Sequence, residues 1–299
     1  MSRGDRSSGL STIEADHLGR VAVVTGANRG MGKETALALA RMGCTVILGC
    51  RNQERGEAAA QEINEATRGT AVPLELDLSS LASVRSFVSA FNEGFSTLDV
   101  LVNNAAASLK IREVSADGFE LHWATNVLGP HFLTQLLLPA LRASGHGRVV
   151  SVSTLPAGGL DLSDTQYESR RFSGLGAYRA SKQAVQMLTF ALAARLEPQL
   201  VTANALNPGY VLTELTTNVG GLLKALIVLT SFRAVSEAEG ADTAIWLAAS
   251  PEVEGISGRF WNKRREARRK FGDHQEIEQL WALVEGQLDA ADRATSAAR

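Results

Sequence analysis

Tyr178 and Lys182 are the two residues of this 299-residue chain whose types and spacing most directly suggest chemistry. They stand four positions apart in a helical pattern, so they project from the same face, one turn apart. A free tyrosine hydroxyl has a pKa of about 10, and a nearby ammonium group favours the phenolate and lowers that pKa. The pair is therefore a candidate general acid or base, although the same spacing often arises by chance on a helix surface.

A second candidate site follows the apolar run Val21–Val24. Gly26, Gly30 and Gly32 come after that run, just before a helical pattern. Glycines at this place let the chain turn sharply and bring backbone N–H groups against a pyrophosphate at a helix N-terminus. The spacing differs from the commonest dinucleotide fingerprint, whose first two glycines are separated by a single residue. The run indicates a nucleotide-phosphate site, and a plain strand-to-helix turn is the alternative.

The choice of cofactor depends on the end of the second predicted strand. Units that prefer the non-phosphorylated dinucleotide carry an Asp or Glu about 20 residues past the glycines. Here that position reads Gly49-Cys50-Arg51, with no acid. Arg29 and Arg51 are either solvated surface arginines or two guanidinium groups that bind an extra phosphate in bidentate fashion. We favour the phosphate interpretation, which predicts NADP(H) as the cofactor.

Apolar runs and helical patterns alternate along the chain, as in an α/β protein that forms one large domain or two small ones. Strands are expected at Val21–Thr25, Thr45–Cys50, Val72–Leu76, Leu98–Val102, Arg148–Thr154, Val201–Leu206 and Gly258–Trp261. Helices are expected at Met31–Met42, Asn52–Arg68, Ser80–Glu93, Ser115–Leu141, Ala177–Leu196, Ser236–Ala249 and Gln275–Leu288.

Polar residues stand at the carboxyl ends of several predicted strands. Asp77 follows the third strand, where a short acceptor can meet an adenine amino group or cap the next helix. Asn126 lies among apolar residues of a helical pattern, where an amide with a purely structural role is an equally good explanation. The fourth and fifth strands close on Asn103, Asn104, Ser153 and Thr154.

Composition excludes several classes of protein. The net charge of −2 implies no general attraction to nucleic acid or anionic membrane, and the basic cluster Lys263–Lys270 lacks interleaved aromatic residues. Two cysteines, Cys44 and Cys50, favour a reduced compartment. Residues 1–18 are expected to be a disordered lead-in, and the apolar stretch Val219–Phe232 is too short to span a bilayer. We therefore expect a cytoplasmic protein with no transmembrane segment, no nucleic-acid partner and no metal.

Taken in order, these motifs closely resemble the short-chain dehydrogenase/reductase family over about residues 19 to 262. Within that family, Gly49-Cys50-Arg51-Asn52 and Asp117-Gly118-Phe119-Glu120 look most like the retinol-dehydrogenase-like branch, as does the long segment between Thr154 and Tyr178. The motifs that carry the family resemblance are Thr25-Gly26-Ala27-Asn28-Arg29-Gly30-Met31-Gly32, Asp77-Leu78, Asn103-Asn104-Ala105-Ala106, Asn126, Ser153-Thr154, Tyr178-x-x-x-Lys182 and Asn207-Pro208-Gly209.

The resemblance implies a single α/β domain. It would contain a doubly wound (Rossmann), mainly parallel sheet with helices on both faces. Residues 19–290 would form an NADP-binding catalytic domain, with a substrate lid at about 212–235 and a frayed tail at 291–299. It also implies a homo-oligomer, through pairing of the two long helices expected at Ser115–Leu141 and Ala177–Leu196.

Roles for individual residues follow from the same resemblance. Hydride would move between the nicotinamide and a hydrophobic alcohol or carbonyl substrate, with Tyr178 as general acid or base. Lys182 would lower the pKa of Tyr178 and hold the nicotinamide ribose, and Asn126 would position a water for proton relay. A hydroxyl at the end of the fifth strand would hydrogen-bond the substrate oxygen. The cofactor site would comprise Gly26, Asn28, Arg29, Gly30, Met31, Gly32, Arg51, Asp77, Leu78, Asn104, Ala105, Ala106, Tyr178, Lys182, Pro208, Gly209, Val211 and Thr213, and Asn103 would line it.

Two positions depart from the family pattern. Ala106 adds a methyl group where the family usually has glycine. Alignment of Gly147–Val150 puts Thr154 at the position of the catalytic serine, and Ser153 stands one residue earlier. Because neighbouring residues on a strand point to opposite faces, the two hydroxyls cannot serve equally. We prefer Thr154 and keep Ser153 as the alternative.

Two hypotheses of function remain. The first is an NADP-dependent oxidoreductase that acts on a hydrophobic alcohol or carbonyl compound. The second is a non-catalytic NADP-binding regulator or scaffold on the same fold, suggested by the two departures. The presence of Asn126, Tyr178 and Lys182 together favours the enzyme, because a scaffold does not need them.

Overall fold

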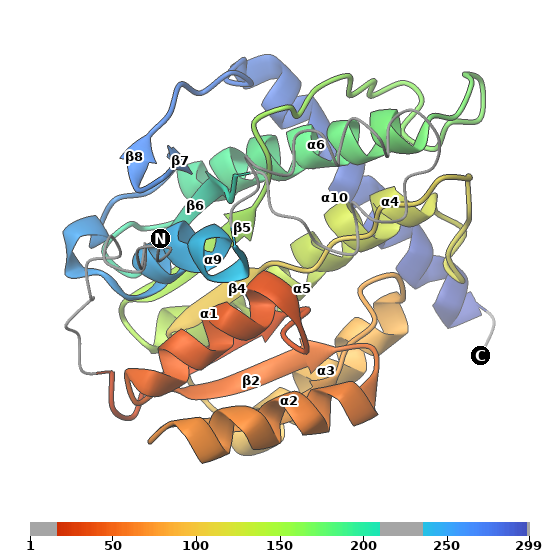
Figure 1. Ribbon diagram of the computed structural model, residues 1–299. Helices are drawn as coiled ribbons and strands as arrows, with labels where there is room; N and C mark the ends of the chain where they lie inside the picture. Colours follow the sequence, from red (N-terminus) through yellow and green to blue (C-terminus); the bar gives the residue numbers. More distant parts are fainter. Residues whose placement is uncertain (1–16, 210–235, 298–299) are drawn as a thin grey trace, which may run out of the picture.

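The structure, a computed structural model, describes residues 17–209 and 236–297 (Figure 1). Several predictions lie outside these residues: most of the lead-in, the lid at about 212–235, and the cofactor contacts Val211 and Thr213.

One mainly parallel sheet of eight strands forms the centre of the described molecule, in the order β3-β2-β1-β4-β5-β6-β7-β8. Every neighbouring pair is parallel except β7 with β8. The strand order reverses between β1 and β4, and in such sheets ligands bind beyond the carboxyl ends of the strands at this point. The strands are β1 (Val21–Thr25), β2 (Thr45–Cys50), β3 (Thr70–Glu75), β4 (Val100–Asn103), β5 (Gly147–Val152), β6 (Val201–Asn207), β7 (Phe260–Asn262) and β8 (Arg265–Glu266).

Helices cover both faces of the sheet, which confirms the doubly wound fold predicted from the sequence (Figure 1). Alternate residues of β1 show the two layers: Ala22 and Val24 pack with α1, α2 and α9, and Val21 and Val23 pack with α3, α5 and α6. The helices are α1 (Gly30–Arg41), α2 (Gln53–Ala66), α3 (Leu81–Gly94), α4 (Leu121–Trp123), α5 (Gly129–Ala143), α6 (Gly174–Arg195), α9 (Glu237–Ala249) and α10 (His274–Ala297).

The helix expected at Ser115–Leu141 is shorter and interrupted. Residues Ser115–Glu120 form a turn instead, in which the Gly118 N–H donates to the Ser115 carbonyl at 3.0 Å and Gly118 has φ +85°. The helix begins with α4, passes through the π-helical turn η1 (Ala124–Leu128) and continues as α5. The periodic apolar pattern continues through the turn, but a left-handed glycine ends helical backbone geometry there.

The last helix extends further than predicted and covers an unexpected face. α10 remains helical through Ala297, where the sequence suggested an end at Leu288 and a frayed tail, and its alanine-rich end favours helix. Ile277, Leu280, Val284 and Leu288 are buried in the same core cluster as α5 and α6. Since α10 lies across this helix pair (Figure 1), pairing of two copies through that face would require α10 to move away.

Candidate active site

The glycine turn after β1 forms a tight cradle at the start of α1. Gly26 and Gly30 have left-handed φ angles of +67° and +59°, which other residues rarely adopt. A Cβ atom added to Gly32 would lie 2.4 Å from the Gly26 carbonyl oxygen and 2.6 Å from the Asn104 side-chain nitrogen. Only glycine fits these positions without rearrangement, so the N-terminus of α1 presents bare backbone, as an anion-binding turn requires.

Asn104 and Ala105 are fixed beneath this cradle by Thr25. The Thr25 hydroxyl accepts hydrogen bonds from the backbone N–H groups of Asn104 and Ala105, both at 3.0 Å. The Asn104 side chain donates to the Thr25 carbonyl at 2.9 Å. The structure thus brings the ends of β1 and β4 together, and Ala106 follows directly, half-buried.

Arg29 and Arg51 stand at the same edge of the sheet. Arg29 precedes α1, and Arg51 directly follows β2, whose Gly49 carbonyl accepts from the Gly26 N–H at 2.7 Å. Both side chains are exposed, while Asn28 and Met31 beside the cradle are half-buried. Two exposed arginines therefore stand in the turns that follow β1 and β2.

Asp77 does not cap helix α3. The Ser80 hydroxyl accepts from the Ser83 N–H at 3.3 Å and so provides the cap. One carboxylate oxygen of Asp77 accepts from the backbone and hydroxyl of Ser79, at 2.9 and 2.6 Å. The capping alternative is therefore wrong. Contact of Asp77 and the buried Leu78 with adenine stays a prediction.

Tyr178 and Lys182 lie one turn apart on α6, as predicted. The Lys182 ammonium donates to the Val152 carbonyl at 2.7 Å and lies 5.8 Å from the centre of the Tyr178 ring. Burial lowers the pKa of Lys182 to about 8. Burial also raises the pKa of the Tyr178 hydroxyl to about 12, although the residue as a whole is only half-buried. The cause of this rise is desolvation of the phenolate, and the lowering of the tyrosine pKa by Lys182 stays a prediction.

The Asn126 side chain holds a loop in place. Its carbonyl oxygen accepts from the Ala107 N–H at 2.7 Å, and its amide nitrogen donates to the Ala107 carbonyl at 3.0 Å and to the Ser181 hydroxyl at 2.9 Å. Ser181 in turn donates to the Tyr178 carbonyl at 2.8 Å. The amide therefore links the loop after β4 to α6. Because its side-chain atoms already have partners, another atom of Asn126 would have to hold the predicted relay water.

Ser153 and Thr154 have different surroundings. Ser153 is buried, and its hydroxyl donates to the Lys182 carbonyl at 2.7 Å and accepts from the Gln186 amide at 3.0 Å. Gln186 also donates to the Thr154 carbonyl at 2.9 Å, and Thr154 is half-buried at the end of β5. The Ser153 hydroxyl thus anchors β5 to α6 beneath the site.

The Asn103 side chain points towards α5, and its predicted place beside the cofactor stays a prediction. Its side-chain nitrogen donates to the Thr134 hydroxyl of α5 at 3.0 Å, and the residue is buried. Asn103 and Asn104 are neighbours at the end of a strand, so their side chains point to opposite faces of the sheet. Only Asn104 reaches the cradle.

The end of β6 is tied to two neighbouring segments by Asn207. Its side chain accepts from the Leu155 N–H at 3.1 Å and donates to the Asn262 side chain at 2.8 Å. Pro208 and Gly209 follow, with Gly209 at φ +85°, and turn the chain out of the sheet. Their contacts with the nicotinamide stay predictions.

Two supporting roles were not predicted from the sequence. They are the hydrogen bonds of the Gln186 side chain and the anchoring of neighbouring segments by the Asn207 side chain. Gln186 was detectable, because it stands four positions after Lys182 and eight after Tyr178 on the same face of α6. Asn207 carries no comparable signal, since its partners come from a loop and from a strand far along the chain.

The residues present fit a dinucleotide. The cradle leaves no room for a Cβ at Gly32, and Arg29 and Arg51 are exposed at the same edge of the sheet. A doubly wound sheet with such a turn after its first strand is the architecture of dinucleotide-binding domains.

Comparison with known proteins identifies the family. A model of the short chain dehydrogenase family matches residues 20–221, and the chain belongs to that family. Retinol dehydrogenase 13 of Mus musculus is 37% identical over 270 residues, which cover 87% of this chain and 80% of that protein. Polyprenol dehydrogenase of Mus musculus is 41% identical over 263 residues, which cover 83% of this chain and 77% of that protein. The predicted retinol-dehydrogenase-like branch is confirmed.

A solved structure gives the same fold. A protein from Beutenbergia cavernae, named as an NAD(P) dependent gluconate 5-dehydrogenase and containing NADP at low occupancy, has a TM-score of 0.68 and 29% identity. The match covers 83% of this chain and 96% of that one.

Within residues 17–209 and 236–297, no helix has the length and apolar character needed to cross a membrane.

Proposed function

We propose that this oxidoreductase uses NADP(H) to transfer a hydride to or from a hydrophobic alcohol or carbonyl compound, with Tyr178 as the general acid or base. The observation that carries the proposal is the placement of Tyr178 and Lys182 on one face of α6, with the Lys182 ammonium 2.7 Å from the last carbonyl of β5. This placement sets a phenol and an amine beside the carboxyl end of the sheet, where the cradle also opens.

Each residue has a distinct task in this proposal. Tyr178 exchanges a proton with the substrate oxygen, and Thr154 donates a hydrogen bond to the same oxygen. Lys182 holds the cofactor ribose, and Asn126 keeps the loop after β4 against α6. The cofactor supplies or accepts the hydride. Ser153 is left out of the reaction, because its hydroxyl already has a donor and an acceptor partner.

The protonation state of Tyr178 suits the role of a general acid in carbonyl reduction. Burial raises the pKa of Tyr178 to about 12, so the phenol carries its proton at neutral pH and can donate it.

A hydrophobic substrate is supported by exposed apolar side chains near Tyr178. Leu155 directly follows Thr154 and is 50% exposed, and Leu175, three residues before Tyr178, is 60% exposed. The loop after β4 contributes the exposed Ile111 and passes close to Gly174, the residue before Leu175. Retinol and polyprenol, named for two relatives, are themselves hydrophobic alcohols.

NADP(H) is supported by Arg29 and Arg51 and by the lack of an acidic residue at Cys50. An arginine fork suits a phosphate better than a ribose hydroxyl. The structural relative from Beutenbergia cavernae was solved with NADP.

The test measures the oxidation of NADPH through the loss of NADPH absorbance. The substrates are a panel of long-chain and aromatic aldehydes and ketones. The proposal expects turnover with apolar members of the panel and little with short polar ones. The scaffold hypothesis, suggested by Ala106 and Thr154, expects dinucleotide binding in a calorimeter without turnover on any member.

Two further expectations belong to this proposal. We propose the cytoplasm as the compartment, since Cys44 and Cys50 are buried free thiols.

The predicted homo-oligomer would have to use a surface other than the α5–α6 face, which α10 covers. Light scattering of the purified protein would decide between monomer and oligomer, and a dimer that is lost on substitution of α5 surface residues would contradict this account of α10.

A further inference from the structure

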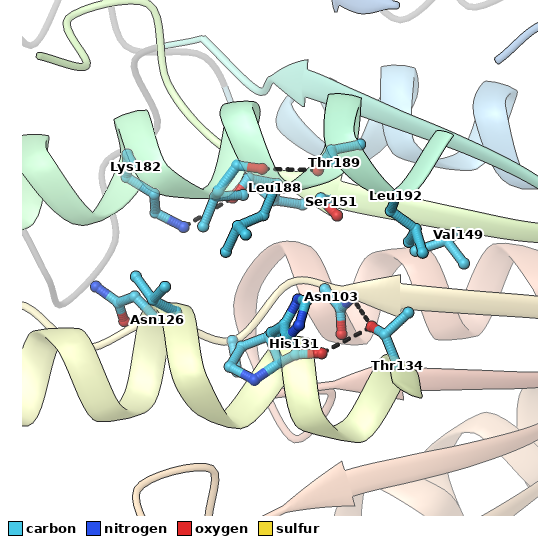
Figure 2. A pocket seen from close by; sticks show the side chains of 15 residues that line it. Asn103, Asn126, His131, Thr134, Val149, Ser151, Lys182, Leu188, Thr189 and Leu192 are labelled. Atoms are coloured by element: carbon cyan, nitrogen blue, oxygen red, sulfur yellow. Dashed lines mark hydrogen bonds between the residues drawn. The ribbon is translucent and has the colours of Figure 1, made fainter. Parts of the chain in front are cut away.

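The loop of residues 107–112, which follows β4, starts beside the proposed active site. Asn126 binds both backbone groups of Ala107, the first residue of this loop, at 2.7 and 3.0 Å. Figure 2 shows the Asn126 side chain opposite Lys182. The loop therefore begins at the place where the proposed reaction occurs.

His122 holds the next part of the same loop. It stands four positions before Asn126, so the two side chains leave the same face of the helical segment formed by α4 and η1. The Nε2 atom of His122 accepts from the Leu109 N–H at 2.9 Å, so the ring proton is on Nδ1. Nδ1 in turn donates to a carboxylate oxygen of Glu120 at 2.7 Å. Glu120 thus selects the tautomer whose Nε2 atom can hold the loop.

The pair of His122 and Glu120 is buried and fully hydrogen-bonded. Each side chain is 1% exposed. The second carboxylate oxygen of Glu120 accepts from the Trp123 N–H at 2.9 Å, and the Glu120 N–H donates to the Gln166 side chain at 2.7 Å. A buried carboxylate costs stability unless it is hydrogen-bonded, and apolar side chains would avoid that cost. A role in positioning accounts for the presence of such a pair.

The segment before α6 packs against the same histidine. The centre of the Phe172 ring lies 6.0 Å from the centre of the His122 ring. Gly174 approaches the loop so closely that an added Cβ would lie 1.9 Å from the Leu109 carbonyl oxygen. His122 therefore binds the N–H of Leu109 while the start of α6 lies against the carbonyl of the same residue.

Two exposed apolar side chains flank this contact. Leu175 directly follows Gly174 and is 60% exposed, and Ile111, two positions after Leu109, is 67% exposed. Leu175 also stands three positions before Tyr178 on α6. Exposed apolar side chains that gather beside a site indicate that an apolar ligand covers them.

We propose that His122, oriented by Glu120, is a positioning residue that holds residues 107–112 against the start of α6. The held loop gives the site an apolar entrance, formed by Ile111 and Leu175. The inference rests on the proposed function and names the part of the substrate that decides affinity. This part is an extended apolar chain, which lies at the entrance while the carbonyl group lies at the reacting end.

The cofactor side of the segment after β4 has a separate anchor. Thr25 accepts from the backbone N–H groups of Asn104 and Ala105, both at 3.0 Å. Loss of the His122 contact should therefore weaken substrate binding and leave the affinity for NADPH within about twofold of the parent value. Calorimetry with NADPH measures that affinity, and a tenfold loss would contradict the separation of the two anchors.

The first test follows the loop and does not depend on turnover. In His122→Phe the Leu109 N–H loses its acceptor, so its exchange with solvent, measured by NMR, should be at least about tenfold faster. The Ala107 amide, which Asn126 holds, is the internal reference and should keep the parent rate. His122→Gln, whose side-chain oxygen can replace Nε2 as acceptor, should restore most of the protection. Equal exchange of the Leu109 amide in the parent and in His122→Phe would overturn the positioning role.

The second test measures kcat and KM for linear aldehydes from butanal to decanal. His122→Phe should lower kcat/KM about tenfold for decanal, mainly through KM, and about twofold for butanal, whose chain is too short to fill the entrance. His122→Gln should stay within about threefold of the parent for both aldehydes. A loss in His122→Phe that does not depend on chain length would overturn the proposal.

Gln166→Ala replaces His122→Phe if that variant fails to fold. Gln166 is half-buried, and its loss removes the acceptor of the Glu120 N–H. The Leu109 amide should again exchange faster, and the loss of kcat/KM should again be larger for decanal than for butanal. Parent values of both measurements would overturn the proposal.

Ile111→Ser and Leu175→Ser test the entrance without a change in the buried pair. Both positions are exposed, so neither variant should alter the fold. Each should lower kcat/KM for decanal about fivefold relative to butanal. Leu200→Ser is the matched control, because this exposed leucine precedes β6 at the opposite end of the sheet, and it should leave that ratio unchanged. The parent ratio in both entrance variants would overturn the entrance.

The outcomes separate this inference from the proposed function. A parent protein that reduces no aldehyde would overturn the proposed function and the substrate entrance together, and exchange of the Leu109 amide would still decide whether His122 holds the loop. An active parent whose entrance variants keep its chain-length preference would overturn the entrance and leave the oxidoreductase intact.

Discussion

The Lys182 ammonium is bound to the Val152 carbonyl at 2.7 Å and lies 5.8 Å from the centre of the Tyr178 ring. It is therefore fixed to the end of β5 rather than to the phenol. Because Lys182 is 3% exposed, the charge sits in a poorly solvated place, and its pKa falls from 10.5 to about 8.

This depressed pKa predicts a pH-dependent stability. The unfolded chain binds more protons than the folded one between pH 8 and 10.5, so folding stability rises with pH across that window. Relative to Lys182→Met, the parent protein should gain about 3 kcal/mol between the two ends of the window. Urea unfolding of both proteins at pH 7.5 and pH 10 measures the difference, without cofactor. Lys110→Met is the control because Lys110 is exposed, and a constant difference for Lys182→Met would contradict the burial argument.

Thr154 and Ser153 should respond differently to loss of the hydroxyl. Thr154→Val should lower kcat about 100-fold with little effect on melting temperature, because the hydroxyl is proposed to bind the substrate oxygen. Ser153→Ala should cost about 2 kcal/mol of stability, since it removes partners of Lys182 and Gln186, and should keep most of the activity. Steady-state kinetics and thermal unfolding of both variants provide the comparison. The reverse order of the two kcat values would assign the substrate contact to Ser153.

Arg29 and Arg51 should set the preference between the two dinucleotides. Arg29→Ala and Arg51→Asp should each weaken NADPH binding about tenfold or more and leave NADH binding nearly unchanged. Calorimetry with both dinucleotides measures the effect. Arg41→Ala, at the far end of α1, is the matched control. Equal affinity of the parent protein for NADPH and NADH would refute the role of these arginines.

Most of the fold was predictable because its strands are buried on both faces. Runs such as Val21–Thr25 and Thr45–Cys50 are mainly apolar, which is typical of a parallel sheet. The start of the long helix was not predictable from local sequence. There Asp117 accepts from the Leu81 N–H of α3 at 2.8 Å, so a contact between distant segments stabilises the turn at Gly118.

The parts of the site whose geometry depends on sequence spacing could be predicted. The properties that depend on burial in the folded protein could not. The glycine turn and the Tyr178–Lys182 pair depend on local backbone and were placed correctly. The pKa of Tyr178 and the direction of Asn103 depend on what the rest of the sheet and α5 bring against them. Likewise, nothing local shows that α10 would return to cover α5 and α6.

The most direct test of the central claim is the rate of NADPH-dependent carbonyl reduction by Tyr178→Phe, compared with Tyr167→Phe. Both substitutions remove one hydroxyl from a tyrosine and keep the ring, but Tyr167 lies in the segment before α6, where the Arg170 guanidinium stacks on its ring. Tyr178→Phe should reduce kcat by about 10³-fold and still bind NADPH, and Tyr167→Phe should keep the parent rate. Turnover that survives undiminished in Tyr178→Phe would contradict the account.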